Sequence, residues 1–256
     1  RLISVDWDNG LIRAESGVTL NEILKLAVPR GWFLNVAPGT KYVSLGGAIA
    51  NDVHGKNHHN SGSFGNYVEK ISLLKSDQSS HILSRDGNRD LFETTISGLG
   101  LTGFIEWAEI RLKKINSTNM IVENIKYNSL DEFFKISHES KSWEYVAAWV
   151  DCMAPTKNIG RGVLTRSKHS NDGNINISNH KKVSLPINFP NWLLNKHSIK
   201  VFNLIYRNLG SYQPKTQLLD YEKVLFPLDN IKYWNRMYGS RGFYQHQSII
   251  PKISSR

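Results

Sequence analysis

Apolar side chains recur at helical spacing early in the chain. Thr19 and Glu22 carry the spacing of a capping box, which predicts that a helix opens at this point. Residues 10–17 ("GLIRAESG") before it are strand-like, and residues 28–31 ("VPRG") are expected to end it. The apolar face of the predicted helix consists of Leu20, Ile23, Leu24 and Ala27.

Period-two patterns predict strands further along. Residues 67–84 ("YVEKISLLKSDQSSHILS") indicate a hairpin with a polar turn near 77–80. A short helix is expected over 90–96, followed by the loop "GLGLTG". In residues 108–114 ("AEIRLKK") every second side chain is apolar, which predicts a strand with one solvent-facing side.

The pattern restarts after "KINSTN", which suggests a second folding unit. A strand is predicted over 120–127, and Ser129 to Glu132 form a second capping box that opens a helix. The segment "WEYVAAWVDC" (143–152) is again strand-like. We therefore place a domain boundary near Asn116.

Two later segments have a distinctive composition. Residues 167–182 ("SKHSNDGNINISNHKK") are polar and rich in turn formers, so we expect a mobile loop. The closing section, residues 220–251, is rich in aromatic residues and is expected to lie mainly in the core, with one rim free to line a pocket. Its aromatic residues include Tyr233, Trp234, Tyr238, Phe243 and Tyr244.

Composition narrows the function classes. The chain has 256 residues, 40% of them hydrophobic, which suffices for a substantial core. Its net charge of +10 favours an anionic partner, namely a phosphorylated substrate, nucleotide, nucleic acid or acidic membrane surface, although simple solubility explains it equally well. Cys152 is the single cysteine, which excludes an intrachain disulfide framework and fits a reducing compartment. From its start at Arg1 and its end in "IIPKISSR", we interpret the chain as an internal fragment of a longer protein.

The histidines of the glycine-rich segment 37–66 raise the question of a metal site. His54, His58 and His59 have a spacing that would place two imidazoles one helical turn apart. The surrounding "GKNHHNSG" is typical of turns rather than of a helix, and Asp52 is the only further ligand nearby. We therefore expect no bound metal.

The same segment also suits a phosphate-bearing cofactor. Residues 38–40 predict a tight turn, and Ser44 can cap a helix that opens at Leu45, Gly46 and Gly47. Backbone N–H groups at a helix start attract phosphate, and glycines let a ligand approach closely. On spacing alone, the glycines could equally serve helix packing.

Longer motifs carry a resemblance to a known family. Residues 38–68 ("PGTKYVSLGGAIANDVHGKNHHNSGSFGNYV") closely resemble the flavin-binding signature of the vanillyl-alcohol-oxidase (PCMH-type) superfamily, within its decaprenylphosphoryl-β-D-ribose 2′-oxidase branch. The similarity extends over both halves of the chain. It continues in "LFETTISGLGLTGFI", "NIGRGVLTR", "FPNWLLNK" and "WNRMYGSRGFYQHQSIIP".

The resemblance implies an α+β fold in two parts. Residues 1–116 would form the second subdomain of a PCMH-type FAD-binding domain. Residues 117–256 would form a substrate domain with an antiparallel sheet flanked by helices. The family's N-terminal glycine-rich loop, and its C-terminal section with a lysine near the reacting hydroxyl, have no counterpart in this sequence, so this chain alone is expected to bind FAD poorly.

The resemblance also assigns site residues. It implies noncovalent FAD, and Asn51 stands where relatives can have cysteine. The residues implied to hold the diphosphate, ribityl chain and flavin ring are Gly39, Ser44, Leu45, Gly46, Gly47, Asn51, Asp52, Val53 and His54, with Ile105 contacting the adenine half. The implied catalytic residues are His54 and Lys56, and the implied substrate-binding residues are Lys56, Trp149, Tyr238, Gln245 and Gln247.

The implied reaction is oxidation of a secondary hydroxyl, ribose C2′ of a polyprenyl-phosphoryl pentose, to a ketone by hydride transfer to flavin. It would be the first half of an epimerisation to arabinose in cell-envelope polysaccharide synthesis, completed by a partner reductase. A sugar-lactone or alditol oxidase of the same superfamily and a noncatalytic anion- or metal-binding module are the alternatives. We expect a cytoplasmic or peripheral inner-membrane location, with the periplasmic face also open, and no nucleic-acid partner.

Overall fold

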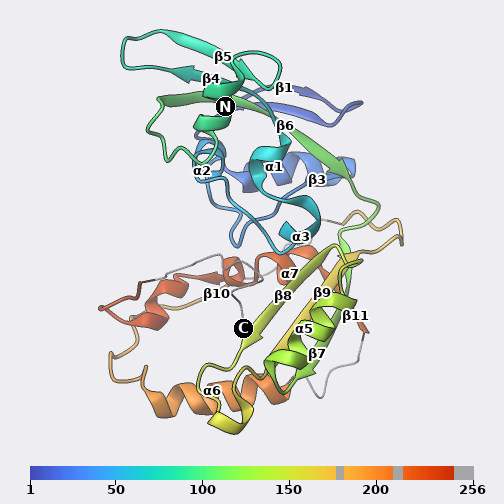
Figure 1. Cartoon of the computed structure of the whole chain (residues 1–256), viewed down its shortest axis with the longest axis vertical. Coiled ribbons are helices and arrows are strands. Elements are labelled where there is room, and N and C mark those ends of the chain that lie inside the picture. The colour runs from blue at the N-terminus through green and yellow to red at the C-terminus, as the bar shows by residue number, and fades with distance from the viewer. Residues whose placement is uncertain (177–181, 210–215, 245–256) are drawn as a thin grey trace.

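Two antiparallel sheets organise the molecule, as Figure 1 shows for this computed structural model, which describes residues 1–176, 182–209 and 216–244. The first sheet has the order β1-β2-β6-β4-β5, and β3 also pairs with β6. Its strands are β1 (Leu2–Asp6), β2 (Leu11–Glu15), β3 (Trp32–Leu34), β4 (Val68–Leu74), β5 (Ser80–Ser84) and β6 (Phe104–Lys114).

The second sheet has the order β11-β7-β9-β8. Its strands are β7 (Asn119–Tyr127), β8 (Tyr145–Val150), β9 (Gly162–His169) and β11 (Thr216–Asp220). A separate short pair joins β10 (Val183–Ser184) to β12 (Ile231–Lys232) in parallel.

Helices surround both sheets. The α-helices are α1 (Leu20–Ala27), α2 (Leu45–Ala50), α3 (His58–Ser61), α4 (Arg89–Thr95), α5 (Leu130–Glu139), α6 (Lys196–Leu209) and α7 (Tyr221–Leu225). Short 3-10 turns are η1 (Val28–Arg30), η2 (Phe64–Tyr67), η3 (Thr156–Asn158), η4 (Pro227–Asn230) and η5 (Trp234–Tyr238). Within the described ranges, the helices lack the combination of length and apolar character that crossing a bilayer requires.

The predicted capping box is confirmed at α1. The Glu22 amide donates to Thr19 Oγ1 at 3.2 Å, and the Thr19 amide donates to the Glu22 carboxylate at 2.8 Å. Together these bonds satisfy donors that a helix start leaves unpaired. All four side chains of the predicted apolar face are buried, so the helix packs its expected side onto the first sheet.

Strand β6 is the centre of the first sheet. It pairs with β2 and β4 along its length and with β3 near its end. The predicted alternation is confirmed, since Ala108, Ile110 and Leu112 are buried and Arg111 is exposed. The strand begins earlier than its alternating pattern indicated, at Phe104, because β4 supplies hydrogen-bond partners as far as that residue.

The aromatic closing section behaves differently from its prediction. Tyr233, Phe243 and Tyr244 are exposed, so the expectation that these residues lie mainly in the core is wrong for them. The reason is that the core positions of this section are taken by residues just upstream. These are Tyr221, Val224, Leu225 and Phe226 of α7 and its C-terminal end.

The predicted mobile loop over residues 167–182 is also partly wrong. Ser167–His169 belong to β9 and pair with Met120–Val122 of β7, so their polar side chains occupy a regular antiparallel ladder. Cross-strand pairing outweighs the turn-forming character of the segment at its start.

The predicted α+β class is confirmed. The two sheets are joined by residues 115–118, and the main hydrophobic core takes buried side chains from both of them. Phe33 of the first sheet, for example, packs edge-on against Tyr221 beside the second, with ring centroids 5.2 Å apart. A domain boundary near Asn116 stays a prediction.

His169 lies in this shared core, at the end of β9. Its ring packs against Phe33 at 5.1 Å and Tyr145 at 6.0 Å, and its Nδ1 lies 3.0 Å from the Ser117 carbonyl oxygen. Its buried Nε2 has no hydrogen-bond partner among the described residues. Burial, with a smaller contribution from the charge of Lys113, lowers the pKa of His169 from 6.5 to about 4.

We expect this histidine to make the fold sensitive to acid. Between pH 6.5 and pH 4 the unfolded chain binds a proton at His169 that the folded chain excludes, so stability falls as the pH falls. His169→Gln should remove about 2 kcal/mol of the difference in unfolding free energy between pH 7 and pH 5. Urea unfolding at both pH values measures this difference, and His138→Gln, on the exposed side of α5, is the control. An unaltered pH dependence in His169→Gln would contradict the prediction.

Candidate cofactor cleft

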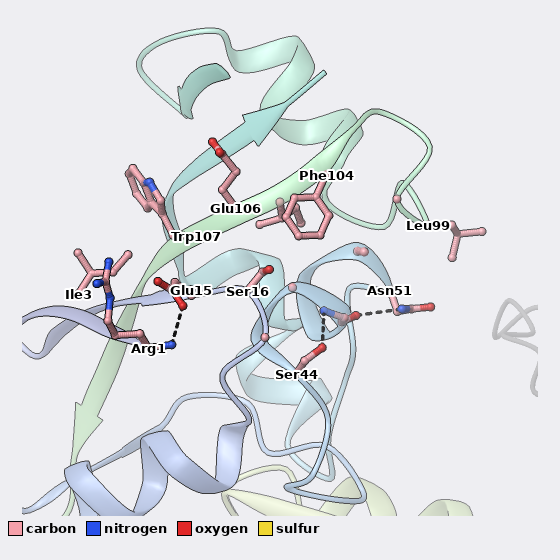
Figure 2. A pocket seen from close by; sticks show the side chains of 16 residues that line it. Arg1, Ile3, Glu15, Ser16, Ser44, Asn51, Leu99, Phe104, Glu106 and Trp107 are labelled. Carbon is pink, nitrogen blue, oxygen red and sulfur yellow. Dashed lines mark hydrogen bonds and ion pairs between the residues drawn. The ribbon is translucent and has the colours of Figure 1, made fainter. Parts of the chain in front are cut away.

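A cleft of about 840 Å³ opens along one edge of the first sheet (Figure 2). It is lined by β1 and the end of β2, the turn after β2, helix α2, the loop at Leu99 and Gly100, and the first residues of β6. The lining includes Glu15, Ser16 and Gly17 from β2 and the turn, Ser44, Gly46, Gly47 and Asn51 at α2, Leu99 from the loop before β6, and Phe104 to Trp107 from β6. Its volume is typical of a site for a small molecule or cofactor.

Helix α2 begins at Ser44, as the sequence predicts. The amide N–H groups of residues 45–47 were expected to face a diphosphate, but all three donate within the protein. Their acceptors are Val18 O at 2.7 Å, Ser16 O at 2.8 Å and Ser44 Oγ at 3.2 Å, respectively. Two of these amides are therefore paired with the turn after β2 and the third with the cap of α2, and their contact with a diphosphate stays a prediction.

The glycines of α2 explain how the turn after β2 can pack so closely against this helix. A Cβ added to Gly46 would lie 2.7 Å from the Cβ of Ser16, and one added to Gly47 would lie 2.9 Å from Ser44 Oγ. Bare backbone at Gly46 is thus required for packing α2 against the turn. Gly17 differs, since a Cβ there meets no atom within 4 Å and would extend into open space at the cleft.

The chemistry of the lining suits part of a flavin dinucleotide. Leu99 and Phe104 expose about two thirds of their surface, 67% and 64%, and offer an apolar face for a ring. Ser16, Ser44 and Asn51 offer hydroxyl and amide groups. The residues present therefore fit a ligand that combines flat rings with a hydroxyl-bearing chain.

Two carboxylates refine this fit. Glu15 and Glu106 also line the cleft, and the Ser72 hydroxyl donates to Glu106 Oε2 at 2.8 Å. Carboxylates accept hydrogen bonds from sugar hydroxyls and repel phosphates. Glu15 is paired with the amino group of Arg1 at 2.8 Å, so it is Glu106 that suits a ribose or ribityl hydroxyl better than the diphosphate.

Five of the ten cofactor residues predicted from the sequence come together here. These five are Ser44, Gly46, Gly47, Asn51 and Ile105. Asn51 lies at the end of α2, where its side-chain amide donates to the Gly47 carbonyl at 2.9 Å, as Figure 2 shows. Ile105 is a buried residue of β6.

The other five lie outside the cleft lining. Leu45 is fully buried in the core, and Val53 packs against that core. Asp52 has a positive φ of 40°, and its Oδ1 accepts a hydrogen bond from the Gly65 amide at 2.7 Å. Gly39 is exposed, and His54 follows α2. For these residues, contact with the cofactor stays a prediction.

The histidine cluster lies on the segment between α2 and η2. An isolated β-bridge to Ser63 holds the backbone of the exposed His54, and its ring centroid is 6.2 Å from that of His58. His58 Nδ1 lies 3.2 Å from the Gly55 carbonyl oxygen, and His59 Nε2 lies 3.0 Å from that of Trp143. Among the described residues, no group of three histidine, cysteine, aspartate or glutamate side chains is arranged to hold a metal ion.

Lys56 lies between the two sheets. Its Nζ donates to the Val224 carbonyl oxygen of α7, and its own carbonyl accepts from the Val146 amide of β8 at 2.8 Å. Burial lowers the pKa of Lys56 from 10.5 to about 8. Lys56 thus has a structural contact that its sequence context did not reveal.

Two predicted substrate residues of the second half, Trp149 and Tyr238, lie outside the cleft lining. Trp149 of β8 packs against Tyr206 of α6 with ring centroids 4.9 Å apart, and Tyr238 of η5 packs against Phe243 at 4.2 Å. Gln245 and Gln247 lie outside the described residues. The substrate roles of all four remain predictions.

Sequence reasoning missed several lining residues. Ser16 and Gly17 follow a predicted strand, and a small polar pair in that position signals only a turn. Phe104 and Trp107 lie on β6, close in sequence to the predicted Ile105. An exposed phenylalanine at the start of a strand was the one available hint, and exposure is known only from the structure.

Comparison with known proteins adds independent information on this chain. Residues 1–82 match the FAD binding domain family, so the predicted FAD-binding domain is confirmed. The chain is 36% identical, over 98% of its length, to decaprenylphosphoryl-beta-D-ribose oxidase of Mycolicibacterium smegmatis, and covers 57% of that protein. The resemblance inferred from sequence motifs therefore extends along nearly the whole chain.

Two further relatives share shorter stretches. An uncharacterized protein in the mprA 5' region of Streptomyces coelicolor is 32% identical over 60% of this chain and 41% of its own length. Human Delta(24)-sterol reductase is 29% identical over 43% of this chain and 22% of its own length. The chain thus spans about half the length, or less, of the curated relatives that it matches.

Proposed function

We propose that this chain, which contains an FAD-binding domain over residues 1–82, is the cofactor-holding and substrate-facing part of an FAD-dependent oxidoreductase that oxidises a sugar hydroxyl. The observation that carries the proposal is the 36% identity to an oxidase over 98% of the chain. The cleft supports it, because residues of the FAD-binding domain and of β6 form it together.

The cofactor and the protein would divide the chemistry between them. When bound, noncovalent FAD supplies a hydride acceptor for oxidation of a secondary alcohol to a ketone. In the cleft, Ser16, Ser44 and Asn51 would bind cofactor hydroxyls, and Phe104 would cover a ring. His54 would lie close to the reacting hydroxyl and hold its proton at a ring nitrogen.

The proposed substrate is a polyprenyl-phosphoryl pentose oxidised at C2′. Its support is the relative from Mycolicibacterium smegmatis, a decaprenylphosphoryl-beta-D-ribose oxidase. The net charge of +10 favours a phosphorylated substrate. Lys56 has three ammonium donors, one of which the Val224 carbonyl takes, so another is available to a substrate oxygen.

A second enzyme would complete the conversion. Oxidation at C2′ removes the stereocentre, so a reductase that delivers hydrogen to the opposite face is required to yield the arabinose isomer. Such a reductase, and peripheral association with the membrane that carries the lipid, are part of the proposal.

Flavin absorption of the purified full-length protein tests the proposal directly. We expect stoichiometric, noncovalent FAD and bleaching of its visible absorption by a polyprenyl-phosphoryl ribose. Gly17→Val should weaken FAD binding by at least about tenfold without loss of folding stability, because its side chain extends into the open cleft. Gly87→Val, at the turn after β5, is the control. A colourless protein that cannot be loaded with FAD would refute the proposed function.

A further inference from the structure

A segment from the second half of the chain lies against the glycine-rich segment. Residues 220–230 follow the edge strand β11 and comprise α7 and η4. Asp220 caps α7, its Oδ1 accepting from the Glu222 amide at 2.8 Å. Leu225 and Phe226 are buried in the main core, so the segment is firmly anchored.

Asp229 makes the most specific contact of this segment. Its side chain is buried, with 7% of the residue exposed. Its Oδ1 accepts from the Thr40 hydroxyl at 2.7 Å, and its Oδ2 accepts from the Lys41 amide at 2.8 Å. Hydrogen bonds to an ionised carboxylate are stronger than bonds between neutral groups, so Asp229 fixes both a side chain and the backbone of this turn.

A second contact strengthens the same junction. The Lys41 ammonium pairs with Glu222, and Lys41 is itself 4% exposed. A buried lysine requires such a partner, because an unpaired charge in the protein interior is costly. Glu222 and Asp229 therefore both anchor residues 40–41.

The segment also contacts the chain after α2. There the Val224 carbonyl accepts from Lys56 Nζ. Residues 220–230 thus contact the chain both before α2, at residues 40–41, and after it, at Lys56. Helix α2 is the element that brings Ser44, Gly46 and Gly47 to the cleft.

Backbone contacts link residue 41 to the start of helix α2 by way of the start of helix α1. The Lys41 carbonyl accepts from the Asn21 amide at 2.7 Å, and the Val43 carbonyl accepts from the Leu20 amide at 3.0 Å. An isolated bridge then pairs Thr19 with Ser44, the cap of α2. A displacement of residues 40–41 would consequently move the start of α2.

We propose that Asp229 is a positioning residue for the FAD cleft, through which residues 220–230 hold the approach to α2 in its binding geometry. The inference rests on the proposed function and deepens it. It makes cofactor binding depend on Asp229, which lies 147 residues beyond residue 82, the end of the matched FAD-binding domain. The carboxylate of Asp229 bonds to Thr40 and Lys41, which lie outside the cleft lining, so it acts on the cleft through them.

Isosteric replacement of Asp229 in the full-length protein tests the proposal. Asp229→Asn places an amide NH₂ toward either the Thr40 hydroxyl or the Lys41 amide, and that donor then has no acceptor. We expect the dissociation constant for FAD to rise roughly 10- to 100-fold. The Lys41 amide should exchange with solvent deuterium at least about tenfold faster in the apoprotein, since its acceptor is weakened.

Asp151→Asn is the matched control. Asp151 is another buried carboxylate of the second half, bonded to Arg161 and Asn203, and lies outside the cleft. It should lower stability without changing the FAD dissociation constant. If Asp229→Asn fails to fold, Thr40→Val removes one of the two bonds and should raise the constant by a smaller factor.

Two results would overturn the proposal: FAD affinity unchanged in Asp229→Asn, or weakened equally in Asp151→Asn. If the wild-type protein binds no FAD, the proposed function fails separately. The positioning role is then judged by amide exchange, and unchanged protection of Lys41 in Asp229→Asn overturns it.

Discussion

Replacing His54 with alanine in the full-length protein should lower turnover by roughly 10²–10⁴-fold while leaving FAD bound, the loss typical of a positioned proton-transfer group. His54 lies four residues after the end of α2, and the bridge to Ser63 fixes its backbone, so the residue is held close in sequence to the cleft-forming helix. It is exposed and lies outside the lining, so its removal should leave the cofactor in place.

Reduction of the bound flavin by a polyprenyl-phosphoryl pentose, followed by stopped-flow absorption, measures this effect. Lys56→Met provides the contrast, because a cation on a substrate phosphate or hydroxyl contributes mainly to binding of the ground state. It should raise KM more than it lowers kcat. His138→Ala, on the exposed surface of α5, should change neither constant. Unaltered kinetics in both His54→Ala and Lys56→Met would leave His54 as a structural residue of its turn.

Substitution of Gly46 by alanine should destabilise the protein by about 2 kcal/mol and weaken FAD binding by at least about tenfold. The added Cβ would lie 2.7 Å from the Ser16 Cβ and 3.4 Å from the Ser16 carbonyl oxygen, so α2 must move away from the turn. Alanine at an unconstrained helix position is more stable than glycine by up to about 1 kcal/mol, so destabilisation here indicates the clash.

Gly47→Ala is the matched comparison, one residue along the same helix. Its Cβ would meet only the Ser44 hydroxyl, at 2.9 Å, which disturbs the helix cap but not the packing of α2 on the turn. Loss of a cap costs about 1 kcal/mol. Chemical unfolding and flavin fluorescence on both variants separate the two effects. Equal behaviour of Gly46→Ala and Gly47→Ala would show that the Ser16 contact does not position α2.

Local elements of this protein could be predicted because their signals are local. The capping box at Thr19, the hairpin over residues 67–84 and the alternation around Ile110 each depend on neighbours within a few positions. Several elements were missed, among them β1, β3, β9 and α6, and the short helix α3 lies where the sequence indicated only turns. The three residues of β3, for example, are stabilised as a strand only by pairing with β6.

The candidate site was predicted in part for the same reason. The motif around Ser44 to Asn51 is contiguous, so its helix and its glycines were evident in the sequence. The residues that face this motif across the cleft could not be identified from the sequence. Ser16 lies about thirty positions before α2 and Glu106 about sixty after it, and no sequence pattern links them.

By itself, the sequence determined the cap and glycines of α2 and, through its motifs, the family resemblance that implied the α+β class, because the cap and the motifs depend on the identity and order of nearby residues. Only the tertiary structure decided what the amides of residues 45–47 bind, that Lys56 reaches Val224, and that Asp229 holds Thr40 and Lys41. A polar group takes the nearest suitable partner in space, and partners 168 to 189 positions apart meet only when the two sheets pack on one core.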